Sequence, residues 1–170
     1  IWNIDGFGDF LSDNKDRVEY YVKKNENDIS FKTLFRINES PLKIDLLNYH
    51  KKKESNLEII VNGKKDLKDN LYFEKISLLE NDNKIIINKL LLSNFNEIKK
   101  VKKINFDYED KDKLRNIISI SKKKNNYILL GESFNANRLI ETLLEPEDKK
   151  SFFKGDTRFD ISINKTYLDK

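Results

Sequence analysis

The side chains that most often perform catalysis are scarce in this chain. His50 is the only histidine and there is no cysteine, so the sequence offers neither a histidine-based metal cluster nor a thiolate nucleophile. A general base at His50 would need an orienting carboxylate and a nucleophile, and the sequence identifies neither of these partners. We therefore predict that the protein is not an enzyme and has no catalytic residue.

One acidic cluster has the residue types that bind cations. Asp107, Glu109, Asp110 and Asp112 lie within six residues of one another and would be spread across a turn. A calcium-binding loop also requires a glycine and a terminal glutamate at set positions, which this segment does not supply. We predict no metal site here and no cofactor.

The chain is basic, with a net charge of +4 and 36% charged residues. Lysine, asparagine and isoleucine are abundant together, which is the bias of an AT-rich genome. We interpret the lysines mainly as a solvated face, with a nucleic-acid or anionic-lipid surface as the alternative. The aromatic residues fall at alternating positions beside Ile and Leu, which favours core packing over base stacking. We predict no nucleic-acid partner.

Most of the chain alternates between apolar and polar residues at a period of two. Ile29, Phe31, Thr33, Phe35 and Ile37 mark one such strand, and similar strands recur between short polar turns. This pattern predicts a mainly β fold with an antiparallel meander. A long meander with one apolar face is expected to curl into a trough-like or taco-like sheet, here with one short helix near the C-terminus.

The pattern also predicts where the parts of the chain begin and end. We expect an irregular lead-in over 1–16, which is rich in Gly, Asp and Asn, and then a strand meander over 17–131. Within the meander, Asn62-Gly63 has the composition of a turn that ends a strand. The apolar face switches within 71–78, which predicts a bulge near Glu74 or Lys75.

A helix over 135–145 is predicted by apolar residues at the helical period. Leu139, Ile140, Leu143 and Leu144 form one stripe, and Pro146 ends the helix. A last strand is expected over 157–168. The chain contains no methionine, from which we expect a segment of a longer, repeat-like protein, with this strand starting the next repeat.

A sheet with one apolar face has to cover that face. It closes into a barrel, packs as a sandwich, or curls into a trough that holds an apolar ligand. From the alternation we predict a set of side chains that share one face and line such a groove. They are Phe31, Phe35, Ile44, Leu46, Ile59, Val61, Ile85, Ile87, Ile104, Phe106, Ile118, Ile120, Leu129, Ile161 and Ile163.

The C-terminal part of the chain resembles the AsmA-like envelope proteins, the group that contains YhdP and TamB. The resemblance rests on Tyr127-Ile128-Leu129-Leu130-Gly131-Glu132-Ser133-Phe134-Asn135-Ala136, followed by Leu139-Ile140 and Leu143-Leu144. In that group a strand ends in Gly, and a small-Phe-polar turn leads into a short helix. The stretch from Gly155 to Leu168 is similar to the recurring strand of that group, which ends in a Tyr-Leu or Val-Leu step.

The resemblance implies a bridge-like lipid-transfer protein of Gram-negative bacteria. Such proteins are anchored in the inner membrane and extend through the periplasm as a long β-sheet trough. Phospholipid moves along the apolar groove between the inner and outer membranes. The resemblance therefore implies a phospholipid partner, and contacts with both membranes through parts of the longer protein outside this chain.

Two other classes of protein remain open on the sequence alone. One is a closed β-sandwich that serves as a structural or adhesive module and fills its apolar face with its own side chains; a lipopolysaccharide-transport β-jellyroll is a relative of the groove hypothesis with another cargo. The other is an enzyme whose carboxylates converge from loops.

Overall fold

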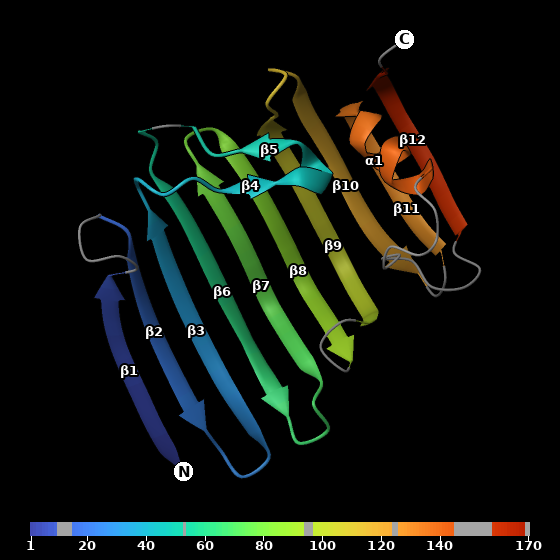
Figure 1. Cartoon of the computed structure of the whole chain (residues 1–170). Coiled ribbons are helices and arrows are strands. Elements are labelled where there is room, and N and C mark those ends of the chain that lie inside the picture. The colour runs from blue at the N-terminus through green and yellow to red at the C-terminus, as the bar shows by residue number, and fades with distance from the viewer. Residues whose placement is uncertain (10–14, 53, 94–96, 124–125, 145–157, 169–170) are drawn as a thin grey trace.

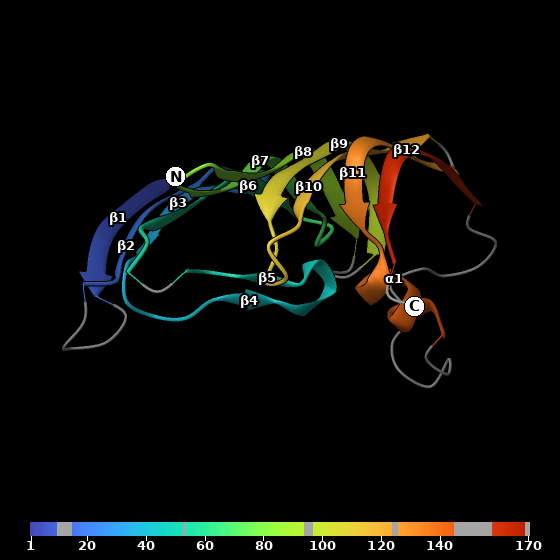
Figure 2. The same cartoon turned by 90° about the horizontal axis from the view of Figure 1, so that it is seen from above.

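Ten strands form one continuous sheet in the computed structural model, which describes residues 1–9, 15–52, 54–93, 97–123, 126–144 and 158–168 (Figure 1). In their order across the sheet they are β1 (Trp2–Asp9), β2 (Arg17–Lys24), β3 (Asp28–Ile37), β6 (Leu57–Asp66), β7 (Leu71–Glu80), β8 (Asn83–Ser93), β9 (Glu97–Glu109), β10 (Arg115–Lys123), β11 (Asn126–Asn135) and β12 (Arg158–Tyr167). The sheet is curved, and Figure 2 shows it as an arch. The predicted fold, a mainly β protein built on a curved and mostly antiparallel sheet, is confirmed.

The segment that joins β3 to β6 leaves the sheet. Residues 38–56, which we call the strap, contain the short strands β4 (Lys43–Ile44) and β5 (Tyr49–His50) and the 3₁₀ helix η1 (Asp45–Leu47) between them. Figures 1 and 2 show β4 and β5 crossing in front of the long strands on the concave side of the arch. The strap therefore covers part of the concave face, which we will call the inner face.

The helix α1 (Asn137–Leu144) connects β11 to β12 and also lies on the inner side (Figure 2). It contacts η1 of the strap. The prediction of 135–145 is shifted, because Asn135 is the last residue of β11, and Glu145 and Pro146 lie outside the described residues. β12 begins beside the first residue of β11 (Asn126↔Arg158), so the two strands pair in parallel. The other neighbouring strands of the sheet are antiparallel.

The predicted irregular lead-in is wrong for residues 2–9. These residues form the edge strand β1, which pairs with β2 from Trp2↔Lys24 to Asp9↔Arg17. Gly6 suits this strand because the ring of Tyr20 lies across it: a Cβ at Gly6 would approach the Tyr20 hydroxyl oxygen to 2.6 Å. Ladder hydrogen bonds and this ring contact outweigh the turn preference of the local composition. Residues 10–14 of the predicted lead-in lie outside the described residues.

The strand that contains Asn62-Gly63 does not end there. β6 continues to Asp66, whose carboxylate then accepts the amides of Lys68 and Asn70 and closes the turn. At this point the pairing with β7 skips one residue of β7, because Asn62 pairs with Lys75 but Gly63 pairs with Phe73. Glu74 is therefore the extra residue of a β-bulge, and the predicted bulge near Glu74 or Lys75 is confirmed.

Among the described residues, no helix is long and apolar enough to cross a membrane.

Candidate functional site

The inner face carries rows of apolar side chains that run across the strands. Residues paired directly in neighbouring strands project to the same face, so the register defines each row. The strap row is Phe35, Ile59, Leu78, Ile85, Phe106, Ile118, Gly131 and Ile163. The middle row is Thr33, Val61, Ile76, Ile87, Ile104, Ile120, Leu129 and Ile161. The third row is Phe31, Gly63, Phe73, Leu90 and Val101.

These rows hold all of the predicted groove residues except Ile44 and Leu46. Both of these lie in the strap and not in the long sheet. Ile44 is half-buried and packs on the core cluster, but the side chain of Leu46 is 41% exposed. Ile44 and Leu46 were predicted to share one face because they are two residues apart, as on a continuous strand. The 3₁₀ turn η1 replaces period two by period three, so that Leu47 packs on the core instead of Leu46.

The strap covers only one half of the inner face. Beneath it, Leu57, Leu78, Ile85, Phe106 and Ile118 are buried, together with Tyr49 of the strap itself. These side chains form the protein's own core. Phe106 in particular is 8% exposed, so it is a core residue and does not line an open groove.

Over the other half of the inner face, the described residues provide no such cover. Val61, Ile76 and Ile87 of the middle row are only half-buried, and so are Phe31 and Phe73, whose rings meet edge to face at 5.9 Å. Toward β12 the same surface deepens into a second cluster, in which Val101, Tyr127 and Leu129 are buried against Ile87, Leu90, Ile98, Ile104, Ile120 and Phe159. The middle row crosses from β3 to β12, a distance of about 34 Å at 4.8 Å per strand.

Several residues of this face were not predicted from the sequence. Ile76, Phe73 and Leu90 belong to its rows but were not among the predicted groove residues. The bulge at Glu74 and the left-handed backbone of Lys89 (φ 52°) interrupt the alternation beside them. The sequence signal that could have identified these residues is the switch of apolar face within one strand. Such a switch marks a bulge, after which the strand continues to line the same face of the sheet.

A buried carboxylate ties the strap to the sheet. Glu80, at the end of β7, is fully buried and accepts the Tyr49 hydroxyl at 2.7 Å and the Lys52 amide at 2.7 Å. It also accepts the hydroxyl of Ser55 and the side-chain amide of Asn83. Burial alone would raise the pKa of Glu80, but these four hydrogen bonds outweigh it, and the pKa lies below its usual value.

Two further groups hold the strap in place. The Tyr108 hydroxyl of β9 donates to the carbonyl of Leu47 at 2.8 Å, and the ring of Tyr108 packs edge to face against that of Tyr49 at 6.0 Å. Burial, followed by the hydrogen bond to Glu80, raises the pKa of Tyr49, and burial raises that of Tyr108. At the other end of the strap, Asp16 is fully buried and accepts three successive backbone amides of residues 38–40.

The acidic cluster of β9 and its turn is occupied by structural contacts. Asp110 accepts the amides of Asp112 and Leu114 and the side-chain amide of Asn135. Asp107 pairs with Arg115 at 2.6 Å, and Glu109 pairs with Lys52 at 2.9 Å. His50 lies in β5 opposite Lys43. Within the described ranges, no group of three or more metal-ligating side chains converges.

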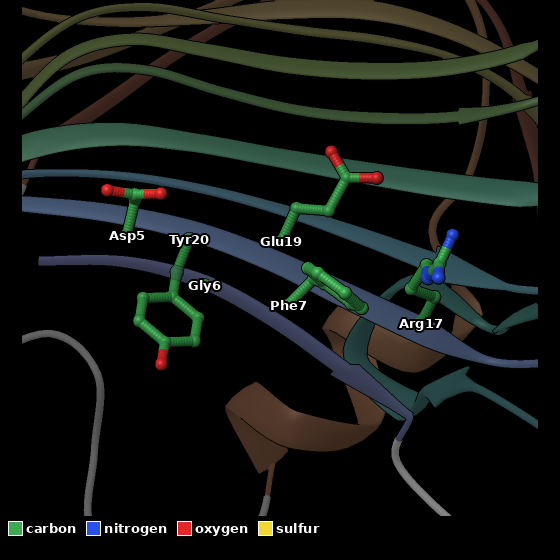
Figure 3. Close-up of a pocket in the computed structure, with 6 residues that line it drawn as sticks. All are labelled: Asp5, Gly6, Phe7, Arg17, Glu19 and Tyr20. Carbon is green, nitrogen blue, oxygen red and sulfur yellow. The ribbon is translucent and has the colours of Figure 1, made fainter.

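An open pocket of about 340 Å³ lies at the β1 edge (Figure 3). It is lined by Asp5, Gly6, Phe7, Arg17, Glu19 and Tyr20. The Arg17 guanidinium lies 5.0 Å from the centre of the Phe7 ring. Figure 3 shows Asp5 and Glu19 on one side of the strands and Tyr20 on the other, so these polar groups do not converge on one point.

Comparison with family models, curated proteins and solved structures found no significant match to this chain. The half-covered apolar inner face is therefore the candidate functional site on geometry alone.

Proposed function

We propose that the inner face shields the acyl chains of a phospholipid, and that the chain is a segment of an AsmA-like periplasmic protein that transports lipid between the inner and outer membranes. The observation that carries this proposal is the uncovered half of the inner face. Val61, Ile76 and Ile87 form an unbroken apolar row there, and their side chains are only half-buried. A folded domain that bound no apolar ligand would be more stable if its own residues covered these side chains.

The size and chemistry of this surface fit an acyl chain. Hydrocarbon in one bilayer leaflet extends about 15 Å, which is shorter than the middle row. Each methylene removed from water contributes about 0.8 kcal/mol, and the row offers aliphatic side chains without a charged group to desolvate. The open side of the arch leaves room for a headgroup to stay in water, where a charge is not penalised by burial.

The closed β-sandwich finds less support. The described strands follow a linear order in which β1 and β12 are the two edges, and the second layer consists of the strap and α1. A lipopolysaccharide cargo would use the same apolar chemistry, and the experiment below separates it from phospholipid by mass.

The test is native mass spectrometry with lipid extraction, on protein purified from a bacterial host. We expect co-purified phospholipid, and we expect Ile87→Asp to reduce it strongly. Ile87 suits this test because it is half-buried in the uncovered half, whereas an Asp at Phe106 would disrupt the core.

Ile86→Asp is the matched control. Ile86 is also half-buried, but it neighbours Ser77 and Asn105 on the outer face of the same strand. Lipid-free wild-type protein, or equal lipid loss in both variants, would refute the groove. Bound lipopolysaccharide in place of phospholipid would refute the assigned cargo.

A further inference from the structure

The convex outer face of the sheet segregates its charges along the strands. Toward the end of the sheet that lies away from the strap, two cross-strand rows can be followed in the register. The first is Tyr21, Lys32, Asn62, Lys75, Asn88 and Lys103, and the second is Lys23, Ser30, Lys64, Tyr72, Leu91 and Lys100. From β2 to β9 each row contains three lysines and no carboxylate, while β1 adds Asp5 to the first row and Asn3 to the second. The bulged Glu74 places one carboxylate beside the rows, where it accepts the Tyr72 hydroxyl. We call them the lysine rows.

The spacing of the lysines in the first row is regular. Lys32, Lys75 and Lys103 are exposed, and each is separated from the next by one intervening strand that contributes an asparagine. At 4.8 Å per strand, the charges lie about 10 Å apart. Among the described residues, none of these three lysines has a carboxylate within ion-pair distance, while Lys64 of the second row has Asp28 at 3.9 Å.

The half of the outer face nearer the strap is organised differently. There the row Arg17, Arg36, Glu58, Leu79, Lys84 and Asp107 mixes both signs of charge. Arg36 pairs with Glu19 and with Glu58, and Arg115 pairs with Asp107. A high lysine content set by genome composition alone would not separate the two halves in this way. The contrast points to an anionic partner for the lysine rows.

We propose that the lysine rows bind the anionic phospholipid headgroups of a membrane surface. A bilayer presents negative charge over an area, so it can engage both rows at once, and it attracts each lysine near its surface. The lysine side chains are long enough to follow the gentle curvature of the arch. A single nucleic-acid strand would instead need exposed aromatic platforms along a row. The lysine rows contain only Tyr21 and Tyr72, and the Tyr72 hydroxyl is bound to Glu74.

This surface is separate from the inner face, so the proposal does not depend on a lipid in the groove. The test is flotation of the whole chain with phosphatidylcholine vesicles that contain or lack phosphatidylglycerol. We expect binding only to the vesicles with phosphatidylglycerol, and we expect it to weaken with added salt. The triple variant Lys32→Gln, Lys75→Gln, Lys103→Gln is expected to bind about 100-fold more weakly, since each lysine contributes about fivefold.

The control removes the same charge elsewhere. It carries Lys43→Gln, Lys84→Gln and Lys111→Gln, three exposed lysines outside the lysine rows. We expect the control to retain most of the binding, with unchanged circular dichroism for both triple variants. Absence of binding at low salt, or equal losses in the two variants, would overturn the proposal. Tighter binding to single-stranded DNA than to the vesicles, lost in the first variant, would overturn it in favour of nucleic acid.

Discussion

The buried contact between Tyr49 and Glu80 allows a sharp test of how the strap is held. Tyr49→Phe removes a hydroxyl that donates at 2.7 Å to a fully buried carboxylate. Tyr108→Phe removes a hydroxyl that donates at 2.8 Å to a neutral backbone carbonyl. Both rings are buried and pack against each other, so the two variants make the same chemical change in the same core.

The two losses should differ because only one acceptor is charged. A hydrogen bond to a charged group contributes about 1.5–3 kcal/mol to stability, and a neutral one about 0.5–1.5 kcal/mol. In Tyr49→Phe the Glu80 carboxylate still accepts hydrogen bonds from three other donors, so it is not left buried without a partner. We therefore expect Tyr49→Phe to lower the free energy of unfolding by about 2 kcal/mol and Tyr108→Phe by about 1 kcal/mol.

Urea unfolding of both variants at neutral pH measures this difference, and the pH dependence supplies a second criterion. At acidic pH Glu80 becomes protonated, so the cost of Tyr49→Phe should shrink while that of Tyr108→Phe stays constant. The reasoning is refuted if Tyr108→Phe is the more destabilising change, or if the cost of Tyr49→Phe does not depend on pH.

Two further predictions concern the glycines and the acid limit of stability. Gly131→Ala should lower the free energy of unfolding by about 1–3 kcal/mol through overpacking, since its Cβ would lie 2.5 Å from the carbonyl oxygen of Ile117. A Cβ at Gly8 meets nothing within 4 Å, so Gly8→Ala should leave the stability nearly unchanged. Thermal melts compare the two variants, and equal melting temperatures would contradict this prediction. The pKa values of Asp16 and Glu80 are held below their usual values by hydrogen bonds that outweigh burial. Their contribution to stability is therefore complete above the unfolded-state pKa, about 4, and is lost as the pH falls through the lower folded-state values. Asp16→Asn should flatten this acid-side loss in unfolding titrations, and an unchanged slope would count against it.

Most inner-face residues of the central strands could be identified from sequence because they lie in stretches of a strand where the alternation is uninterrupted. Ile85 and Ile87, or Ile104 and Phe106, are two residues apart, and the register places both pairs on one face. The bulge at Glu74 was also predictable, since an apolar pattern that changes face within one strand has few other causes.

The strap could not be predicted in the same way. Leu42, Ile44 and Leu46 alternate like a strand, but the segment packs through Leu47 because η1 turns at a period of three. The bond from Tyr49 to Glu80 joins residues 31 positions apart. No local pattern specifies such a pair, because each residue also suits an exposed position in a polar turn. The parallel pairing of β12 was missed for a related reason, since it depends on where α1 returns the chain.

The linear order of the strands has a consequence for how the protein unfolds. In the described sheet, each strand exchanges backbone ladder hydrogen bonds with its immediate neighbours, so we expect unfolding to begin at either edge and proceed inward, as it does in repeat proteins. The strap changes this for the middle of the sheet, because it contacts β7 through Glu80 and β9 through Tyr108 at the same time. We therefore expect strands β6 to β9 to unfold together as one cooperative block. The edge strands β1 and β12 lie outside this block, and we expect them to open and close while the centre of the sheet stays folded.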